Sequence, residues 1–193
     1  MTLTTITLAD LRVGDCRERL AGLLSPRATV VVACDDIVRL PVAVLAAALE
    51  ATVGSGGLLR FEGMSGPARL ALQVADPERR LAVSDAARTS HVGDRPFQVR
   101  LALDGSVHVL LLKGIGQHPH MNESASYEWV RGLDATAVLV DMSNIEHLNS
   151  LLVAWLLQIN QGVGNGRCRL LQVGRQAEAQ LSQLRLNHLL AIG

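Results

Sequence analysis

The sequence has few aromatic residues and no excess of charge of either sign. Phenylalanine, tryptophan and tyrosine make up 3% of the 193 residues, whereas hydrophobic residues together make up 49%. A core must therefore be built mainly from leucine, valine, isoleucine and alanine. Basic and acidic residues number 18 each, so the formal net charge is zero. No basic stripe interleaved with aromatics is present, which argues against nucleic-acid binding.

Cysteines and long apolar runs are also scarce. Cys16, Cys34 and Cys168 lie far apart, with neither a metal-ligand spacing nor an even number for disulfides, which is typical of a reducing compartment. The N-terminus lacks the basic start and long apolar stretch of a secretory signal. The longest apolar run, residues 42–49, falls well short of the ~20 residues of a membrane helix. We therefore expect a cytoplasmic protein that does not insert into a membrane.

The most informative feature that is present is an internal repeat. The apolar run Ala28–Cys34 resembles Ala135–Asp141, and similar residues follow at an offset that changes by one residue after this strand and again at a glycine cluster. The further matches are Ile37 with Ile145, Leu40 with Leu148, Ala46 with Ala154, Leu49 with Leu157, Gly54 with Gly162, Gly56 with Gly164, Leu58–Glu62 with Arg167–Leu171, Ala68 with Ala177, and Leu72 with Leu181. Common ancestry explains these matches; the alternative is that any two strand–helix–strand–helix units look alike.

The pattern of apolar residues predicts an α/β fold, in which a mixed sheet is covered by helices. The predicted strands are 2–8, 29–34, 58–63, 136–141 and 167–173, and the predicted helices are 9–24, 41–53, 66–75, 122–132, 149–161 and 174–185. Residues 84–96 are polar and rich in helix breakers, so we predict a linker there. It divides the chain into a first half, residues 1–90, and a second half, residues 95–193.

A β-hairpin is predicted at the start of the second half. The runs Phe97–Leu103 and Val107–Leu112 alternate apolar and polar residues on either side of Asp104-Gly105. Asp-Gly favours a two-residue type I′ turn, because both central residues of that turn need a positive φ.

A helix start at Asn149-Ser150 is the most distinctive local motif. The buried strand that ends at Asp141 leads through a short loop to these two residues, whose side chains are preferred at helix N-termini. The helix that follows is predicted to bury Leu152, Trp155, Leu156 and Ile159, which recur at helical spacing, and to end at Gly162 and Gly164. One interpretation is that Asn149 and Ser150 only cap the helix. The other makes the Ser150 hydroxyl a site of modification.

The motifs of the second half resemble those of STAS domains, the family of bacterial anti-sigma-factor antagonists. That family has a strand ending in Asp-Leu-Ser, then Asp-Ser-Ser/Ala-Gly at a helix start, then a glycine pair and another strand. Here the corresponding segments are Val140-Asp-Met-Ser, Asn149-Ser150, Gly164-Asn-Gly, and Arg169-Leu-Leu-Gln-Val-Gly. The resemblance covers roughly residues 97–193 well and residues 28–83 weakly. It implies that the chain consists of two STAS-like repeats, the first of them degenerate.

The resemblance implies a role for Ser150. In the family, the first serine of the helix-start motif is phosphorylated by a partner serine kinase that also acts as an anti-sigma factor. A phosphate there would meet free backbone N–H groups and the positive end of the helix dipole. This sequence departs from the family pattern at Asn149, where the family has aspartate, and at Leu151 and Leu152, where the family has small residues. At the matching place, the first half has Pro41-Val42 and therefore no hydroxyl.

The resemblance thus implies a non-enzymatic interaction module in a partner-switching regulatory system, with a serine kinase or anti-sigma factor as partner and a homodimer as a further possibility. The candidate partner-binding residues are Ser143, Asn149, Leu151 and Leu152, around Ser150 as the candidate phosphoacceptor. We expect the two leucines to expose an apolar anchor there. The alternatives are an accessory or scaffold subunit of a transport or signalling complex, and a sensor domain that binds a nucleotide or another small ligand.

No enzyme chemistry can be assembled from the sequence. It contains no nucleophile with a base to activate it and no motif such as GxSxG or HExxH. His118-Pro119-His120 could suggest a metal site, but it lacks a carboxylate or thiolate partner at ligand spacing, and an exposed loop explains it better. Gly114-Ile-Gly116 lacks the lysine and the full glycine spacing of a phosphate loop. We therefore expect no catalysis, no cofactor and no metal.

Overall fold

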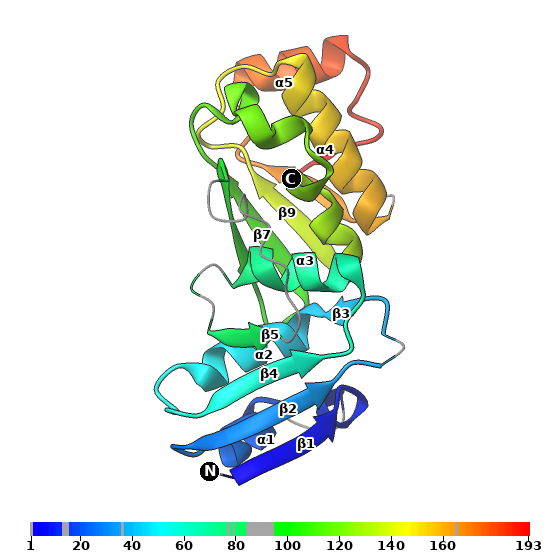
Figure 1. Cartoon of the computed structure of the whole chain (residues 1–193). Helices are drawn as coiled ribbons and strands as arrows, with labels where there is room; N and C mark the ends of the chain where they lie inside the picture. Colours follow the sequence, from blue (N-terminus) through cyan, green and yellow to red (C-terminus); the bar gives the residue numbers. More distant parts are fainter. Residues whose placement is uncertain are drawn as a thin grey trace.

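The computed structural model describes residues 2–12, 16–35, 37–76, 78, 80–83, 95–164 and 166–193. It is an α/β protein with one larger sheet in each half, and the two halves lie one above the other along the length of the molecule (Figure 1). Most of the predicted linker, residues 84–94, lies outside the described residues. No described helix combines the length and apolarity that crossing a membrane requires.

The sheet of the first half has four parallel strands. In spatial order they are β1 (Thr2–Thr7), β2 (Ala28–Ala33), β4 (Leu58–Glu62) and β5 (Leu81–Val83). The connections contain the 3-10 helix η1 (Ala9–Arg12) and the helices α1 (Cys16–Leu23), α2 (Val42–Thr52) and α3 (Gly66–Ala75). In β4, Leu59 and Phe61 are buried while Leu58 and Arg60 are exposed, so helices cover one face of the sheet.

The sheet of the second half has five strands. Their spatial order is β11 (Ala191–Ile192), β10 (Cys168–Leu171), β9 (Ala137–Asp141), β7 (Ser106–Leu111) and β6 (Phe97–Leu101), with only β6 antiparallel to its neighbour. The helices are α4 (Ser150–Val163) and α5 (Arg175–Gln183), and the crossover from β7 to β9 is built from four 3-10 helices. These are η2 (Ile115–Gln117), η3 (Pro119–Asn122), η4 (Ser124–Ser126) and η5 (Glu128–Gly132).

The two halves have the same order of elements. Strands β1, β2, β4 and β5 lie side by side in the same order and parallel sense as β7, β9, β10 and β11, and α2 and α3 occupy the same places in the chain as α4 and α5. This agreement of topology is what the repeat predicts for residues 28–75 and 135–184. Common ancestry of the halves stays a prediction.

Hydrogen bonds correct the proposed alignment in its first strand. The Cys34 N–H donates to Glu62 O at the end of the first sheet, and the equivalent bond in the second sheet runs from Met142 N–H to Leu171 O, both at 2.9 Å. Cys34 therefore corresponds to Met142 and not to Asp141. The sequence match had slipped by one residue, and such a slip matters because successive strand residues point to opposite faces.

The later matches are consistent with the structure, apart from one glycine. Ala68 and Ala177 are both fully buried, and Leu72 and Leu181 are at most 1% exposed. Gly162, however, lies within α4 instead of ending it, and Gly164 is the C-cap. A Cβ atom on Gly162 would lie 2.3 Å from Val130 Cγ1, so this glycine is required by helix packing.

The predicted hairpin forms, but its turn differs from the prediction. Leu101 pairs with Val107, and the turn is closed by hydrogen bonds from Gly105 N–H to Ala102 O and from Ala102 N–H to Ser106 O. Gly105 has a φ of 86°, whereas Asp104 does not have a positive φ. The connection is therefore a three-residue loop with glycine at its left-handed position, and not a type I′ turn.

The predicted helix over 122–132 is wrong. The chain forms the short 3-10 helices η4 and η5 instead, because the carbonyl of Ser126 is used elsewhere. It accepts indole N–H bonds from Trp129 at 2.9 Å and from Trp155 at 3.1 Å. Phe97 lies against both tryptophans, with ring centroids 6.1 and 5.3 Å away. This segment therefore packs in a cluster of aromatic side chains instead of forming a regular α-helix. The cluster forms only in the folded chain, because Trp155 comes from α4.

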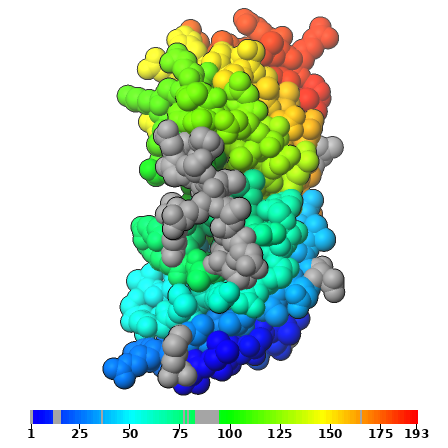
Figure 2. Space-filling view, in the orientation of Figure 1, coloured from blue at the N-terminus to red at the C-terminus, as the bar shows by residue number. Residues whose placement is uncertain are grey.

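The halves share one hydrophobic core and a tight interface. Helix α3 packs against η5, and α2 contacts β6 and β7. A Cβ atom on Gly132 of η5 would lie 2.1 Å from the Pro67 carbonyl oxygen, so backbone meets backbone here. A further two-stranded sheet joins the halves: β3 (Leu40–Pro41) pairs in parallel with β8 (Leu133–Asp134). Figure 2 shows the two halves in direct contact on this face of the molecule.

Candidate functional site

The N-terminus of α4 is held in place by Asn149. Its Oδ1 accepts a hydrogen bond from the Leu152 N–H at 2.9 Å, and its Nδ2 donates to the carbonyl of Gly116 at 2.7 Å. The first bond caps the helix, and the second ties the helix start to η2. The sequence predicted the cap correctly, because asparagine is a preferred N-cap residue.

Gly116 is a member of this site that the sequence analysis missed. A Cβ atom at Gly116 would lie 2.6 Å from Asn149 Nδ2, so no larger residue fits beside the cap. The Gly-Ile-Gly sequence was the available signal, but it was considered only as a phosphate loop. Gly116 and Asn149 lie 33 positions apart in the sequence and are brought together by the crossover from β7 to β9.

Ser150 is the first residue of α4 and is exposed. Within the described residues, its hydroxyl has no hydrogen-bond partner, because Asn149 already performs the capping. Backbone N–H groups in the first turn of a helix have no intrahelical acceptor, and they lie at the positive end of the helix dipole. The Ser150 hydroxyl is therefore accessible and is not used by the fold.

The loop before α4 is fixed by four hydrogen bonds that involve side chains. Ser143 N–H donates to Asp141 Oδ1 at 2.8 Å, and Asn144 Nδ2 donates to the Leu111 carbonyl at 2.9 Å. Leu148 and Gln180 of α5 form the other two, one from the Leu148 N–H and one to its carbonyl, at 2.7 and 3.3 Å. Ser143 and Ser150 are both exposed, one at each end of this braced loop.

The expected anchor formed by Leu151 and Leu152 is partly wrong. Leu152 is 1% exposed, because it belongs to the core-facing stripe of α4, whereas Leu151 is half-buried. The accessible apolar surface behind Ser150 comes instead from residues one and two helical turns further along. Val153 and Leu157 are half-buried and Ala154 is exposed.

The corresponding helix start in the first half is covered. Pro41 is the N-cap of α2 and makes no side-chain cap bond, and Val42 is fully buried. The backbone of Leu40 and Pro41 pairs with Leu133 and Asp134 of the second half. Thus Leu133 and Asp134 occupy this position in the first half. In the second half the Gln180 side chain bonds the backbone of Leu148, and the side chains of Asn149 and Ser150 are exposed.

The second helices of the two halves differ in the same way. Helix α3, which packs against η5, buries Ala71, Val74 and Ala75. The corresponding positions of α5 are Gln180, which is half-buried, and Gln183 and Leu184, which are exposed. Helix α5 therefore presents a more polar surface beside the open start of α4.

The histidines considered as metal ligands take part in local turns. His118 Nδ1 accepts from the His120 N–H at 3.4 Å, and His120 Nδ1 lies 2.7 Å from Glu123 Oε1. Within the described part of the chain, no three or more histidine, cysteine or acidic side chains are grouped as metal ligands would be.

Two of the three thiols are buried, and none of the three cysteines is in a disulfide. Burial raises the pKa of Cys34 to about 11, with a smaller contribution from the charge of Asp35, and burial alone raises that of Cys168 to about 12. Neutral thiols in these positions act as small core residues.

No protein-family model matches the chain, and neither a curated protein nor a solved structure was found to match it.

Proposed function

We propose that this chain is a non-enzymatic, cytoplasmic protein-interaction module of a bacterial partner-switching system, with the open start of α4 as its docking surface. Its partner would be a serine kinase that acts as an anti-sigma factor, and phosphorylation of Ser150 would release that partner. The proposal takes the STAS resemblance of the second half as its starting point.

The contrast between the two helix starts carries the proposal. In the first half this position is filled by Leu133 and Asp134, which pair with Leu40 and Pro41. The fold thus already uses this edge to bind a short extended segment. In the second half, the same position carries Ser150 and an accessible apolar surface made by Val153, Ala154 and Leu157. A segment of a partner protein can dock there against these apolar side chains, although not by strand pairing, because Gln180 already bonds the N–H and the carbonyl of Leu148.

Phosphorylation would act on this surface directly. A phosphate adds about −1.5 to −2 charges and three acceptor oxygens at neutral pH. It would be stabilised by the N–H groups of the first turn of α4, so the helix would tolerate it. A partner that packs apolar side chains against Val153 and Leu157 would instead meet a charged, strongly hydrated group. The same modification therefore preserves the fold and breaks the contact.

The experiment measures the affinity of Ser150→Ala and Ser150→Asp for a partner purified with the wild-type protein from native cells. We expect the alanine variant to bind like the wild type and the aspartate variant to bind at least about tenfold more weakly. Ser124→Asp, at an exposed serine in η4, is the matched control and should bind like the wild type. Mass spectrometry of the protein from native cells should find phosphate on Ser150.

Equal binding by the wild type and both Ser150 variants, together with no phosphate on Ser150, would reject the switch. The identity of the partner tests the remaining alternatives. A serine-kinase-like partner supports the proposal, whereas a transport ATPase would make the chain an accessory subunit. Turnover that is lost on substitution of a single residue of this chain would contradict the non-enzymatic role.

A further inference from the structure

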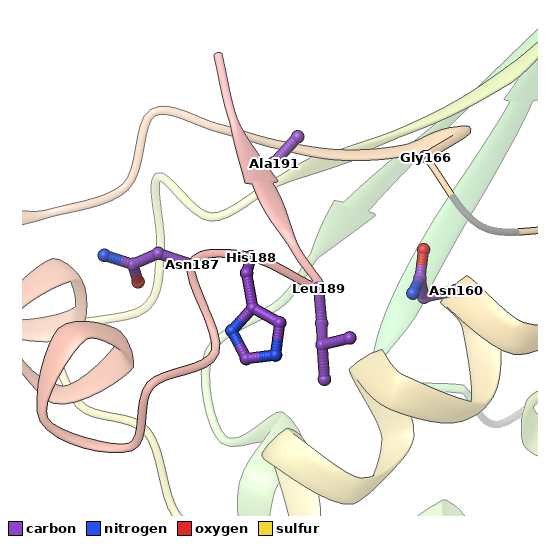
Figure 3. Close-up of a pocket in the computed structure, with 6 residues that line it drawn as sticks. All are labelled: Asn160, Gly166, Asn187, His188, Leu189 and Ala191. Carbon is purple, nitrogen blue, oxygen red and sulfur yellow. The ribbon is translucent and has the colours of Figure 1, made fainter.

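A pocket lies at the other end of α4 from Ser150. Its volume is about 210 Å³, and it is lined by residues from α4, from the turn before β10, and from the segment that follows α5 (Figure 3). These residues are Asn160, Gly166, Asn187, His188, Leu189 and Ala191. At 1.5 Å of rise per residue, Asn160 lies about 15 Å along the helix from Ser150. The pocket is therefore separate from the proposed docking surface.

Asn160 is the unusual residue of this pocket. It is 4% exposed, yet its Oδ1 atom is buried without a hydrogen-bond partner among the described residues. An unpaired buried carbonyl destabilises the fold by about 1–3 kcal/mol. The other side chains that α4 buries are apolar. The equivalent position in the first half is Thr52, whose hydroxyl donates to the Leu49 carbonyl at 2.9 Å. The fold thus satisfies the polar side chain in one half and leaves it unsatisfied in the other.

The lining defines the chemistry of a ligand. No lysine, arginine, aspartate or glutamate is among the described lining residues, so a charged ligand would lack a counter-charge. The carboxamide of Asn160 and the imidazole of His188 supply hydrogen bonds and Leu189 supplies an apolar wall, whereas the side chain of Asn187 points away from the other lining side chains (Figure 3). Asn187 is held in place because its Nδ2 donates to Ser182 Oγ at 2.8 Å. This volume lies below the range of about 300–1,000 Å³ for drug-sized ligands, so one small ring fits best.

We propose that this pocket binds a small neutral molecule with adjacent N–H and C=O groups, such as a cyclic amide, through the carboxamide of Asn160. Asn160 Oδ1 is closed to the pocket as the side chain lies, so binding requires the amide to turn. The ligand N–H then donates to Asn160 Oδ1, and Asn160 Nδ2 donates to the ligand carbonyl. A carboxamide forms this two-point contact with any edge that offers a donor beside an acceptor. The terminal torsion of asparagine is broad, so the amide can turn to align with the ligand. The ligand thus gives Asn160 Oδ1 the hydrogen-bond donor that it lacks among the described residues.

The test uses 2-pyridone as the probe and N-methyl-2-pyridone, which lacks the N–H donor, as its control. NMR titration of the full chain follows the Asn160 side-chain amide and the backbone amide of Gly166. A ligand of this size is expected to bind with a Kd of roughly 1 mM. We expect saturable shifts at both groups with 2-pyridone, and a Kd at least about tenfold higher with the methylated compound.

Asn160→Leu separates binding from folding. Because it replaces an unpaired polar group with an apolar one of similar size, we expect unchanged or higher stability together with loss of 2-pyridone binding. Asn160→Asp is the second variant, since it keeps the acceptor oxygens and loses the donor, and it should also weaken binding. Gln161→Ala, at an exposed neighbour on the same helix, is the control and should bind normally. Absence of saturable shifts in the wild type, or equal binding by Asn160→Leu, would overturn the proposal and leave a pocket that holds only water.

Discussion

The two halves of this protein have the same strand order but differ in what covers their helices. In the first half, the start of α2 pairs with β8 and α3 packs against η5, so both helices are buried against the second half. In the second half, the start of α4 is exposed and α5 presents glutamines where α3 has alanine and valine. With the same topology, the two helices of the first half pack against the second half, whereas those of the second half leave part of their surface accessible to solvent.

This difference also shows why an interaction surface need not have a special fold. The N-cap residue has an extended backbone at both helix starts, whereas the side chains are Pro41 and Val42 in one and Asn149 and Ser150 in the other. Proline supplies a suitable backbone conformation for a helix start but no hydroxyl. Asparagine caps the helix and leaves the neighbouring serine unused.

The largest effect on stability is expected from Gly132→Ala, which disrupts the packing of η5 against α3 between the halves. The added Cβ atom would lie 2.1 Å from the Pro67 carbonyl oxygen, and backbone atoms cannot yield as a flexible side chain can. We expect a loss of about 3 kcal/mol or more in the free energy of unfolding, measured by urea denaturation.

Gly22→Ala is the matched control for this substitution. Gly22 lies in α1, and a Cβ atom added there would meet no described atom within 4 Å, so alanine should raise stability by about 0.5–1 kcal/mol. If Gly132→Ala were as well tolerated, the close packing of α3 on η5 would be contradicted.

Thiol labelling compares how well each half excludes solvent from its buried cysteine. Cys34 follows β2 in the first half and Cys168 lies in β10 of the second, and both are fully buried. Since burial raises their pKa values to about 11 and about 12, the neutral thiol stays favoured until the pH approaches those values. At pH 8 we expect an aromatic disulfide reagent to label Cys16 and to leave Cys34 and Cys168 at least about a hundredfold slower. Rapid labelling of only one buried cysteine would show that its half opens independently.

Asn149→Ala should have an intermediate effect. It removes both the helix cap and the hydrogen bond to the Gly116 carbonyl, so we expect a loss of about 1–2 kcal/mol in the free energy of unfolding. Asn122→Ala, at an exposed asparagine outside this site, is the control and should change stability by less than about 0.5 kcal/mol. Equal stabilities of the two variants would mean that Asn149 does not hold the start of α4.

Ser150→Ala should have the smallest effect. Its hydroxyl makes no hydrogen bond to a described residue, so the free energy of unfolding should change by less than about 0.5 kcal/mol. A loss as large as that of Asn149→Ala would assign Ser150 a capping role and weaken the case for a modification site. Denaturation of the two variants side by side distinguishes these outcomes.

The predicted elements were most accurate where local signals were strong. The helix over 66–75 has the predicted bounds, with Ser65 as its N-cap, and α4 begins at the predicted cap. The segment 122–132 was predicted wrongly because the indole N–H groups of Trp129 and Trp155 converge on the Ser126 carbonyl, and Trp155 comes from another part of the chain. The short strands β3 and β8 went unpredicted for a related reason: each is two residues long and exists only by pairing across the halves.

The sequence by itself determined the α/β class, the repeated order of strands and helices, and the cap at Asn149, because apolar periodicity and capping act over a few neighbouring residues. Only the tertiary structure decided which helix start is covered and what Gly116 and Gly132 pack against. It also decided that Asn160 is buried with an unpaired oxygen beside a pocket. These properties depend on contacts between residues far apart in the chain, some within the second half and others between the halves, and such contacts exist only in the folded protein.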